Sequence, residues 1–117
     1  MAGFRAGQIV IADWRDATPK EANKLRPAIV IEDDALFGPG YPAVILVPLT
    51  EQAALAIPSL SVPIDPTAEN GCATRCYAVS HFVTTTAAAR VRATGSSIRP
   101  EELARIRRQV ALAIGLG

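Results

Sequence analysis

The sequence predicts a mainly β fold with a C-terminal helix, in which short strands form a small, strongly bent sheet or barrel. Up to residue 93, short β-branched and apolar stretches alternate with turn residues such as Gly and Pro. From Pro100 the apolar residues change to the period of a helix. The chain has 117 residues, of which 50% are hydrophobic. These numbers suit one compact domain over residues 1–117.

Three strands are predicted in the first half of the chain. They are Gln8–Asp13 (QIVIAD), Arg26–Glu32 (RPAIVIE) and Ala43–Thr50 (AVILVPLT). The third is apolar on both faces, so we expect it to be central, with Pro48 marking a bulge or the end of regular pairing. Trp14–Leu25 is polar and aperiodic, and we expect a loop whose length is typical of functional loops.

The second half contains shorter strands and the helix. Ser61–Ile64 (SVPI) is expected at a sheet edge because it contains a proline. Thr74–Thr85 is β-rich, and Ala89–Ala93 (ARVRA) alternates as a strand with its two arginines on one face. Pro100 is a favoured first helical residue, and two glutamates follow it at the positive end of the helix dipole. Helical spacing relates Leu103, Ile106, Val110 and Ile114, and Gly115 is the predicted stop.

The charge balance argues against a histone-like nucleic-acid binder, which carries positive charge over its whole surface. Twelve basic and 11 acidic residues leave a net charge of +1, which allows a local basic patch but not positive charge over the whole surface. Ten of the basic residues are arginines, which suits phosphate binding or reflects the codon usage of a GC-rich genome. No stretch approaches about 20 apolar residues, and the N-terminus lacks the order of a signal peptide. We therefore expect a cytoplasmic protein without a membrane span.

Several stretches, taken in order, resemble the MazF/PemK family of toxin endoribonucleases from toxin–antitoxin pairs. The matching stretches are GQIVIADW (Gly7–Trp14), RPAIVI (Arg26–Ile31) with Glu21 five residues before Arg26, VPLT (Val47–Thr50), Arg90 after a β-rich segment, and GSSIRPEELARIRRQVALAIG (Gly95–Gly115). They span almost the whole chain, with a spacing of 24 residues from Arg26 to Thr50. One departure is that Ser80–His81 stands where the family often has Asp-Gln.

The resemblance implies a small SH3-like barrel of the MazF/PemK/CcdB type that forms a symmetric homodimer. It implies that single-stranded RNA lies in a groove across the dimer interface. Sequence-selective cleavage without a metal ion would leave a 2′,3′-cyclic phosphate and a 5′-hydroxyl. A cognate antitoxin protein is the implied partner. We expect no cofactor and no metal, since Cys72, Cys76 and His81 are too few for a zinc site.

Metal-independent cleavage uses the RNA 2′-hydroxyl as nucleophile, so the site needs a base, an acid and groups that stabilise the phosphate oxygens. Arg26 suits the last task because it is always charged and Pro27 restricts its backbone, although a strand-end arginine can simply be solvated. Thr50 offers a hydroxyl donor, or is only a β-branched strand residue. Glu21 is the candidate base, or steers Arg26, or is a solvated loop acid.

A second group of residues has candidate roles in catalysis or RNA binding. His81 titrates near neutrality and is a candidate acid or stacking group, with a structural role as the alternative. Arg75 and Ser80 are further candidates for catalysis or RNA contact. Phosphate contacts are expected from Lys20, Lys24, Arg90 and Arg92. Trp14, Phe37 and Tyr41 are candidates for stacking on unpaired bases.

Two other function classes fit the same residues. One is a non-catalytic, gyrase-directed toxin of the CcdB type, which shares this barrel and contacts its target through the C-terminal helix. The other is a catalytically decayed family member, because the family's aspartate is missing at Ser80. The ordered set of Glu21, Arg26 and Thr50 favours the endoribonuclease.

Overall fold

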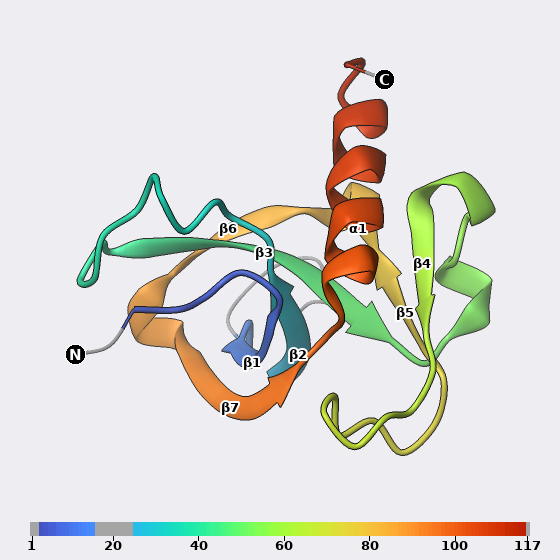
Figure 1. Cartoon of the computed structure of the whole chain (residues 1–117), viewed down its shortest axis with the longest axis horizontal. Helices are drawn as coiled ribbons and strands as arrows, with labels where there is room; N and C mark the ends of the chain where they lie inside the picture. The colour runs from blue at the N-terminus through green and yellow to red at the C-terminus, as the bar shows by residue number, and fades with distance from the viewer. Residues whose placement is uncertain (1–2, 16–24, 117) are drawn as a thin grey trace.

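The computed structural model describes residues 3–15 and 25–116, and seven strands and one α-helix lie within these ranges (Figure 1). The elements are β1 (Gln8–Asp13), β2 (Leu25–Val30), β3 (Ala43–Thr50), β4 (Ser61–Ile64), β5 (Cys76–Val79), β6 (Thr84–Ala87), β7 (Val91–Ser97) and α1 (Pro100–Ala113). Short 3₁₀ turns are η2 (Ala53–Leu55), η3 (Pro58–Leu60), η4 (Ser80–Phe82) and η5 (Ala88–Arg90). The predicted fold class is confirmed. No helix in the described ranges has the length and apolar character needed to cross a membrane.

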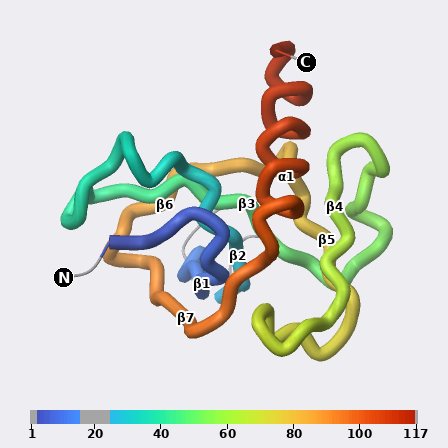
Figure 2. Tube along the Cα trace, in the orientation of Figure 1, coloured from blue at the N-terminus to red at the C-terminus, as the bar shows by residue number. Residues whose placement is uncertain are grey.

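The strands form one antiparallel sheet in the order β4–β5–β3–β2–β1–β7, and β6 also pairs with β3. Figure 1 shows the strands curving round, with α1 standing over one side of them. The trace in Figure 2 shows that the chain passes from β7 directly into α1. β4 ends the strand order, so its predicted edge position is confirmed.

Each face of the sheet buries an apolar cluster, because successive residues of a strand point to opposite sides. The helix-side cluster, which includes a residue of α1, contains Ile9, Ile29, Val47, Leu49 and Ile106. The opposite cluster contains Val10, Ala12, Ala28, Val30, Val44 and Leu46. Burial on both faces explains why the first three strands read as nearly continuous apolar runs in the sequence.

β3 changes its partner strand along its length. On one edge it pairs with β2, from Leu46 to Pro48. On the other edge it pairs with β6 as far as Leu46 and with β5 from Leu49 onward. Pro48 lacks an amide proton and lies in the gap between these two ladders. The prediction that Pro48 marks the end of regular pairing is thus confirmed for this edge, where the sheet bends.

The helix begins at Pro100 as predicted, and the Glu102 carboxylate accepts the backbone N–H of Arg99 at 2.9 Å. It stops before Gly115, whose φ of 89° is left-handed. Ile114, the last residue that helical spacing relates to Leu103, is 64% exposed. Ile114 is the C-cap, where the backbone leaves the helix, and Figure 1 shows the last turn of α1 extending past the sheet.

The segment before the helix differs from the predicted strand Ala89–Ala93. Its first part is the turn η5, and the strand β7 starts only at Val91. The corner is held by the Ala88 N–H, which donates to the Pro42 oxygen at 2.8 Å. Because this bond joins residues far apart in the chain, local alternation did not predict it. Arg90 therefore lies in a turn rather than in a strand.

Candidate functional site

The register of β2 and β3 brings Arg26 and Thr50 to the same end of neighbouring strands. Ala28 is opposite Pro48, and two residues further along β2 reaches Arg26 while β3 reaches Thr50. Opposed residues share a face, and a step of two residues returns to that face. The two side chains therefore project from one face, on strands that lie about 5 Å apart.

This pair belongs to a longer row of residues across the sheet. Thr50 is opposite Tyr77 in β5, and Arg26 is opposite Ala12 in β1. We call Arg26, Thr50 and Tyr77 the cross-strand row. Ala12 and Ala28 share its face and belong to the opposite cluster, so the row lies on the side of the sheet away from α1. Neighbouring strands are about 5 Å apart, so the row spans roughly 10 Å, the scale of a nucleotide and its phosphates.

Thr50 is held in place by its own backbone neighbourhood. The residue is only 6% exposed. Its Oγ1 accepts the N–H of Gln52 at 3.1 Å. A threonine hydroxyl that accepts one hydrogen bond can still donate its own proton. The turn after β3 therefore orients the oxygen and leaves the O–H available as a donor.

Arg75 extends the row at the β5 end. It precedes Tyr77 by two residues and so lies on the same face. Its guanidinium makes two bonds to Asp65, at 2.6 and 3.1 Å, and also interacts with the Tyr77 side chain. The bond from Arg75 lowers the pKa of Asp65, and the same pair raises the pKa of Arg75. Both side chains are more than half exposed, so this pair positions Tyr77 more than it stabilises the fold.

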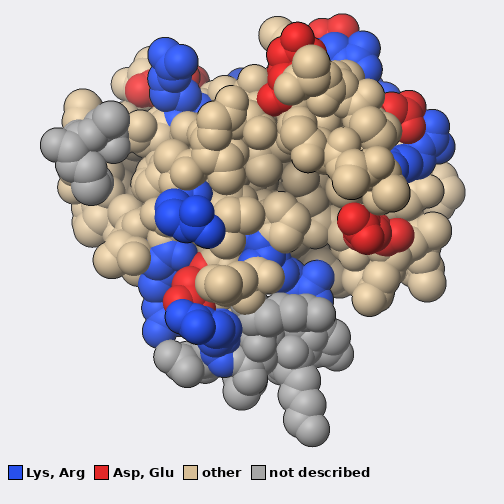
Figure 3. All heavy atoms as spheres, turned by 90° about the horizontal axis from the view of Figure 1, so that it is seen from below, with Lys and Arg blue, Asp and Glu red and all other residues tan. Residues whose placement is uncertain are grey.

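A second basic group surrounds Asp13 at the end of β1. Arg15 donates to both carboxylate oxygens, at 3.0 and 2.8 Å, and Arg90 donates to the Asp13 backbone oxygen at 3.3 Å. The bonds from Arg15, with a smaller contribution from Arg90, lower the pKa of Asp13 to about 2. Figure 3, which views the molecule from below, shows several Lys or Arg side chains close to one another, with acidic atoms among them. Arg92 is opposite Ile11, so it projects from the face away from Arg26.

Ser80 and His81 do not lie in the cross-strand row. Ser80 is 0% exposed, and its hydroxyl donates to Gln109 Oε1 at 2.6 Å. Gln109 in turn donates to the Ser61 oxygen at 3.0 Å, so Ser80 ties η4 to α1 and β4. The His81 ring contacts Phe82 edge-on with centroids 4.6 Å apart, and its buried Nδ1 has no hydrogen-bond partner within the described part of the chain.

Some predicted site residues fall outside the residues that the structure describes, and others lie away from the cross-strand row. Glu21, Lys20 and Lys24 fall outside the described residues, as does most of the predicted loop. Trp14 packs on the opposite cluster and donates its indole N–H to Thr86 Oγ1 at 3.0 Å. The Trp14 ring therefore anchors the chain after β1 to β6.

Tyr77 is the site residue that sequence reasoning missed. For Thr74–Thr85 the sequence predicts only a β-rich segment, with no site residue at position 77. The available signal was the alternation of polar Arg75 and Tyr77 with apolar Cys76 and Ala78, which assigns the polar pair to one face.

The two cysteines are free thiols. Cys76 is the first residue of β5, and Cys72 lies four residues before it. Cys76 is buried, and desolvation together with the neighbouring Cys72 raises its pKa to about 11. The thiolate form is therefore scarce at neutral pH, and Cys76 is a poor nucleophile. Among the described residues, no three His, Cys, Asp or Glu side chains form a group that could hold a metal ion.

Comparison with known families and structures places this geometry in context. The family described as PemK-like, MazF-like toxin of type II toxin-antitoxin system matches residues 5–114. No curated protein matches the chain in sequence.

Solved structures share the fold at low sequence identity. An endoribonuclease in complex with its cognate antitoxin from Mycobacterial species has a TM-score of 0.74 and 16% identity over 98% of each chain. MazF from Deinococcus radiodurans has a TM-score of 0.72 and 18% identity over 96% of each chain. The Mycobacterium tuberculosis toxin MazF-mt6 has a TM-score of 0.71 and 17% identity over 94% of this chain and 98% of its own.

Proposed function

The chain belongs to the PemK-like, MazF-like toxin family of type II toxin–antitoxin systems, and on that premise we propose that it cleaves single-stranded RNA sequence-selectively without a metal ion. The observation that carries this proposal is the common face of Arg26 and Thr50 at neighbouring strand ends. A guanidinium and a hydroxyl donor on one face suit a phosphate group that gains negative charge during the reaction.

The reaction proceeds by attack of the RNA 2′-oxygen on the adjacent phosphorus. The O2′–P bond forms, the P–O5′ bond breaks, and the products carry a 2′,3′-cyclic phosphate and a 5′-hydroxyl. Arg26 and Thr50 donate to the phosphate oxygens as charge builds on them. We assign Glu21 as the base that takes the 2′ proton, on the basis of its place five residues before Arg26 in the sequence.

The leaving 5′-oxygen requires a proton donor. Tyr77 is opposite Thr50 and shares its face, whereas His81 lies in η4, outside the cross-strand row. We therefore assign the acid role to Tyr77, with Arg75 as its positioning residue. His81 and exposed Phe82 instead offer rings on which an unpaired base stacks. Ser80 supports this turn through Gln109.

Basic residues outside the row would hold the rest of the RNA. Arg90 lies next to Asp13 beside the row, so we give it a phosphate contact. Lys20 and Lys24 join it by sequence position. Arg92 projects from the other face of the sheet, so it would contact RNA only where the RNA passes round the sheet edge.

The proposal includes a homodimer and a cognate antitoxin. The last turn of α1 and the residues that follow it carry three exposed apolar side chains, namely Leu112, Ile114 and Leu116. Such a patch suits burial against a second copy. Light scattering after gel filtration tests the dimer. Co-purification with the product of the adjacent reading frame tests the antitoxin, and a partner-free protein that is harmless in cells would count against it.

The decisive experiment incubates the purified chain with mixed-sequence RNA in EDTA and maps the cut ends. We expect 2′,3′-cyclic phosphate ends, and Arg26→Ala should reduce the cleavage rate by about 10²–10³-fold. Arg105→Ala is the matched control, because it removes an exposed arginine from α1 and should leave cleavage unchanged. Intact RNA together with inhibited DNA supercoiling would instead support the gyrase-directed alternative.

A further inference from the structure

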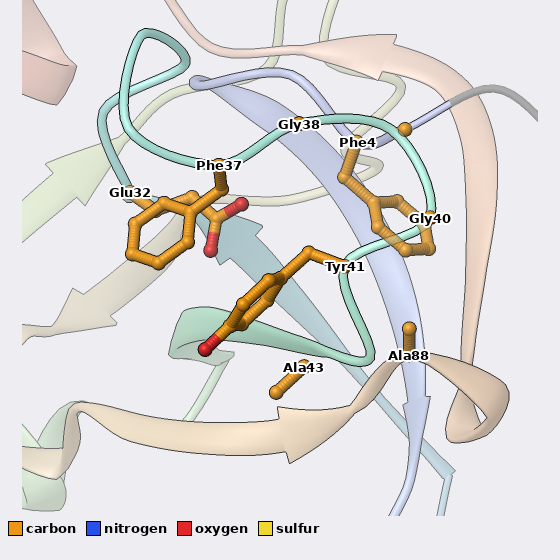
Figure 4. Close-up of a pocket in the computed structure, with 9 residues that line it drawn as sticks. Phe4, Glu32, Phe37, Gly38, Gly40, Tyr41, Ala43 and Ala88 are labelled. Carbon is orange, nitrogen blue, oxygen red and sulfur yellow. The ribbon is translucent and has the colours of Figure 1, made fainter.

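A pocket lies at the other end of β3 from Thr50, beside the turn that joins β2 to β3 (Figure 4). Its lining residues include Phe4, Glu32, Phe37, Tyr41, Ala43 and Ala88. The free space inside is about 20 Å³, enough for one water-sized group. Ala43 is seven residues from Thr50 along β3, so the pocket lies roughly 20 Å from the cross-strand row.

Glu32 brings a buried carboxylate to this pocket. The residue is 9% exposed, and Figure 4 shows its carboxylate directed toward the space beside the Phe37 and Tyr41 rings. Oε1 accepts the backbone N–H of Ile45 at 3.1 Å, which is a neutral donor. No ion pair of Glu32 with another described residue is present. A buried charge without a cation is costly, so the carboxylate points to a cationic partner from outside.

Arg107 contacts the main chain of Glu32 but makes no ion pair with its carboxylate. Arg107 donates to the backbone oxygens of Ile31 and Glu32, at 3.0 and 2.8 Å, and so is engaged with the main chain. Two exposed acids, Asp33 and Asp34, follow Glu32 in the sequence. The charges around the pocket therefore favour the entry of a cation.

Aromatic rings form the remaining walls. Phe37 and Tyr41 pack against each other with centroids 5.2 Å apart and planes tilted by 59°. Gly40, with a φ of 83°, makes the turn that returns Tyr41 to Phe37. Phe4 closes the far side (Figure 4). A cation that lies against the ring faces and next to a carboxylate is stabilised by both interactions.

We propose that this pocket binds a primary ammonium group, supplied by a lysine side chain of a partner protein or by a free alkylamine. The ammonium donates to the Glu32 carboxylate while the rings of Phe37 and Tyr41 surround its carbon stem. The acceptor selects the group, because one carboxylate oxygen of Glu32 already accepts the Ile45 N–H. An ammonium is a compact point charge that needs one acceptor, whereas the planar fork of a guanidinium pairs best with both oxygens of a carboxylate. The proposal is independent of RNA cleavage, since the two sites share no residue.

The test is a titration of the ¹⁵N-labelled protein followed by its amide NMR signals. The probes are n-butylammonium and, at equal concentration, n-butylguanidinium. We expect the first to shift the amide signals of Ile45, Phe37 and Tyr41 saturably, and the second to bind at least several-fold more weakly. Glu32→Gln keeps an oxygen for the Ile45 N–H and should reduce ammonium affinity about tenfold or more. Asp33→Asn removes the same charge one residue away and should leave affinity within about twofold.

A second arm distinguishes the source of the group. Nα-acetyl-lysine N-methylamide presents the lysine side chain with its backbone on both sides. Binding equal to that of n-butylammonium would assign the pocket to lysine from a protein partner, and binding of the free amine alone would assign it to a small amine. No saturable shift with either amine, or equal affinity of the Glu32→Gln and wild-type proteins, would overturn the proposal. RNA cleavage by the Glu32→Gln protein should stay at the wild-type rate.

Discussion

The two ends of β3 carry opposite chemistry on one continuous strand. At Thr50 the strand lies beside β2 with Arg26 and beside β5, so this end places the Arg26 guanidinium and the Thr50 hydroxyl on one face. At Ala43 it borders a pocket in which Glu32 supplies a buried negative charge between aromatic rings. The apolar core between the two ends is shared. Side chains at the strand ends, and not the fold, therefore decide whether an end suits an anion or a cation.

The largest expected effect comes from removing the core that both ends share. Leu46 is fully buried and pairs with β2 on one side and β6 on the other. Leu46→Ala should lower the free energy of unfolding by about 2–5 kcal/mol, through lost transfer energy and a cavity. Urea denaturation measures this change. Leu36→Ala is the control, because Leu36 is 73% exposed and its loss should cost no more than about 0.5 kcal/mol.

Loss of function in Leu46→Ala should affect both ends together. RNA cleavage and ammonium binding are expected to weaken at the same temperature as the protein unfolds. If one activity survived at a temperature where the other was gone, the two ends would not depend on one cooperative core.

A substitution in the cross-strand row should separate the two ends. Tyr77→Phe removes only the hydroxyl, and we expect cleavage to slow by about 100-fold in kcat with little change in KM. The unfolding midpoint and the ammonium titration should stay unchanged. The measurement is steady-state cleavage of a short RNA. Unchanged kcat in Tyr77→Phe would remove Tyr77 from the mechanism without affecting the assignment of Arg26.

The smallest effect concerns Asp13, at the basic end of the sheet. The pKa of Asp13 in the folded protein is lowered to about 2, below the usual value of an aspartate, because Arg15 donates to its carboxylate. A depressed carboxyl pKa contributes stability that is present above about pH 4 and is lost as the pH falls toward 2. The melting temperature of Asp13→Asn should therefore be slightly below that of the wild type at pH 7. The difference should shrink to zero near pH 2, and a difference that persisted there would show that Arg15 does not act through the charge of Asp13.

Sequence reasoning was most successful where structure depends on local patterns. The boundaries of β1, β3 and β4, the edge position of β4 and the start of α1 at Pro100 were all predicted. It failed at η5, where the bond from Ala88 to Pro42 turned an apparent strand into a corner.

The sequence by itself determined the class of fold, the family and the candidate pair of Arg26 and Thr50, because period, proline placement and motif order are local properties of the chain. Only the tertiary structure decided which side chains share a face. Strand register placed Tyr77 opposite Thr50, and packing against α1 turned Ser80 inward. Folding of the β2–β3 turn enclosed Glu32 without an ion pair to another described residue. Register and burial depend on contacts between residues distant in sequence, so periodicity within one strand cannot specify them.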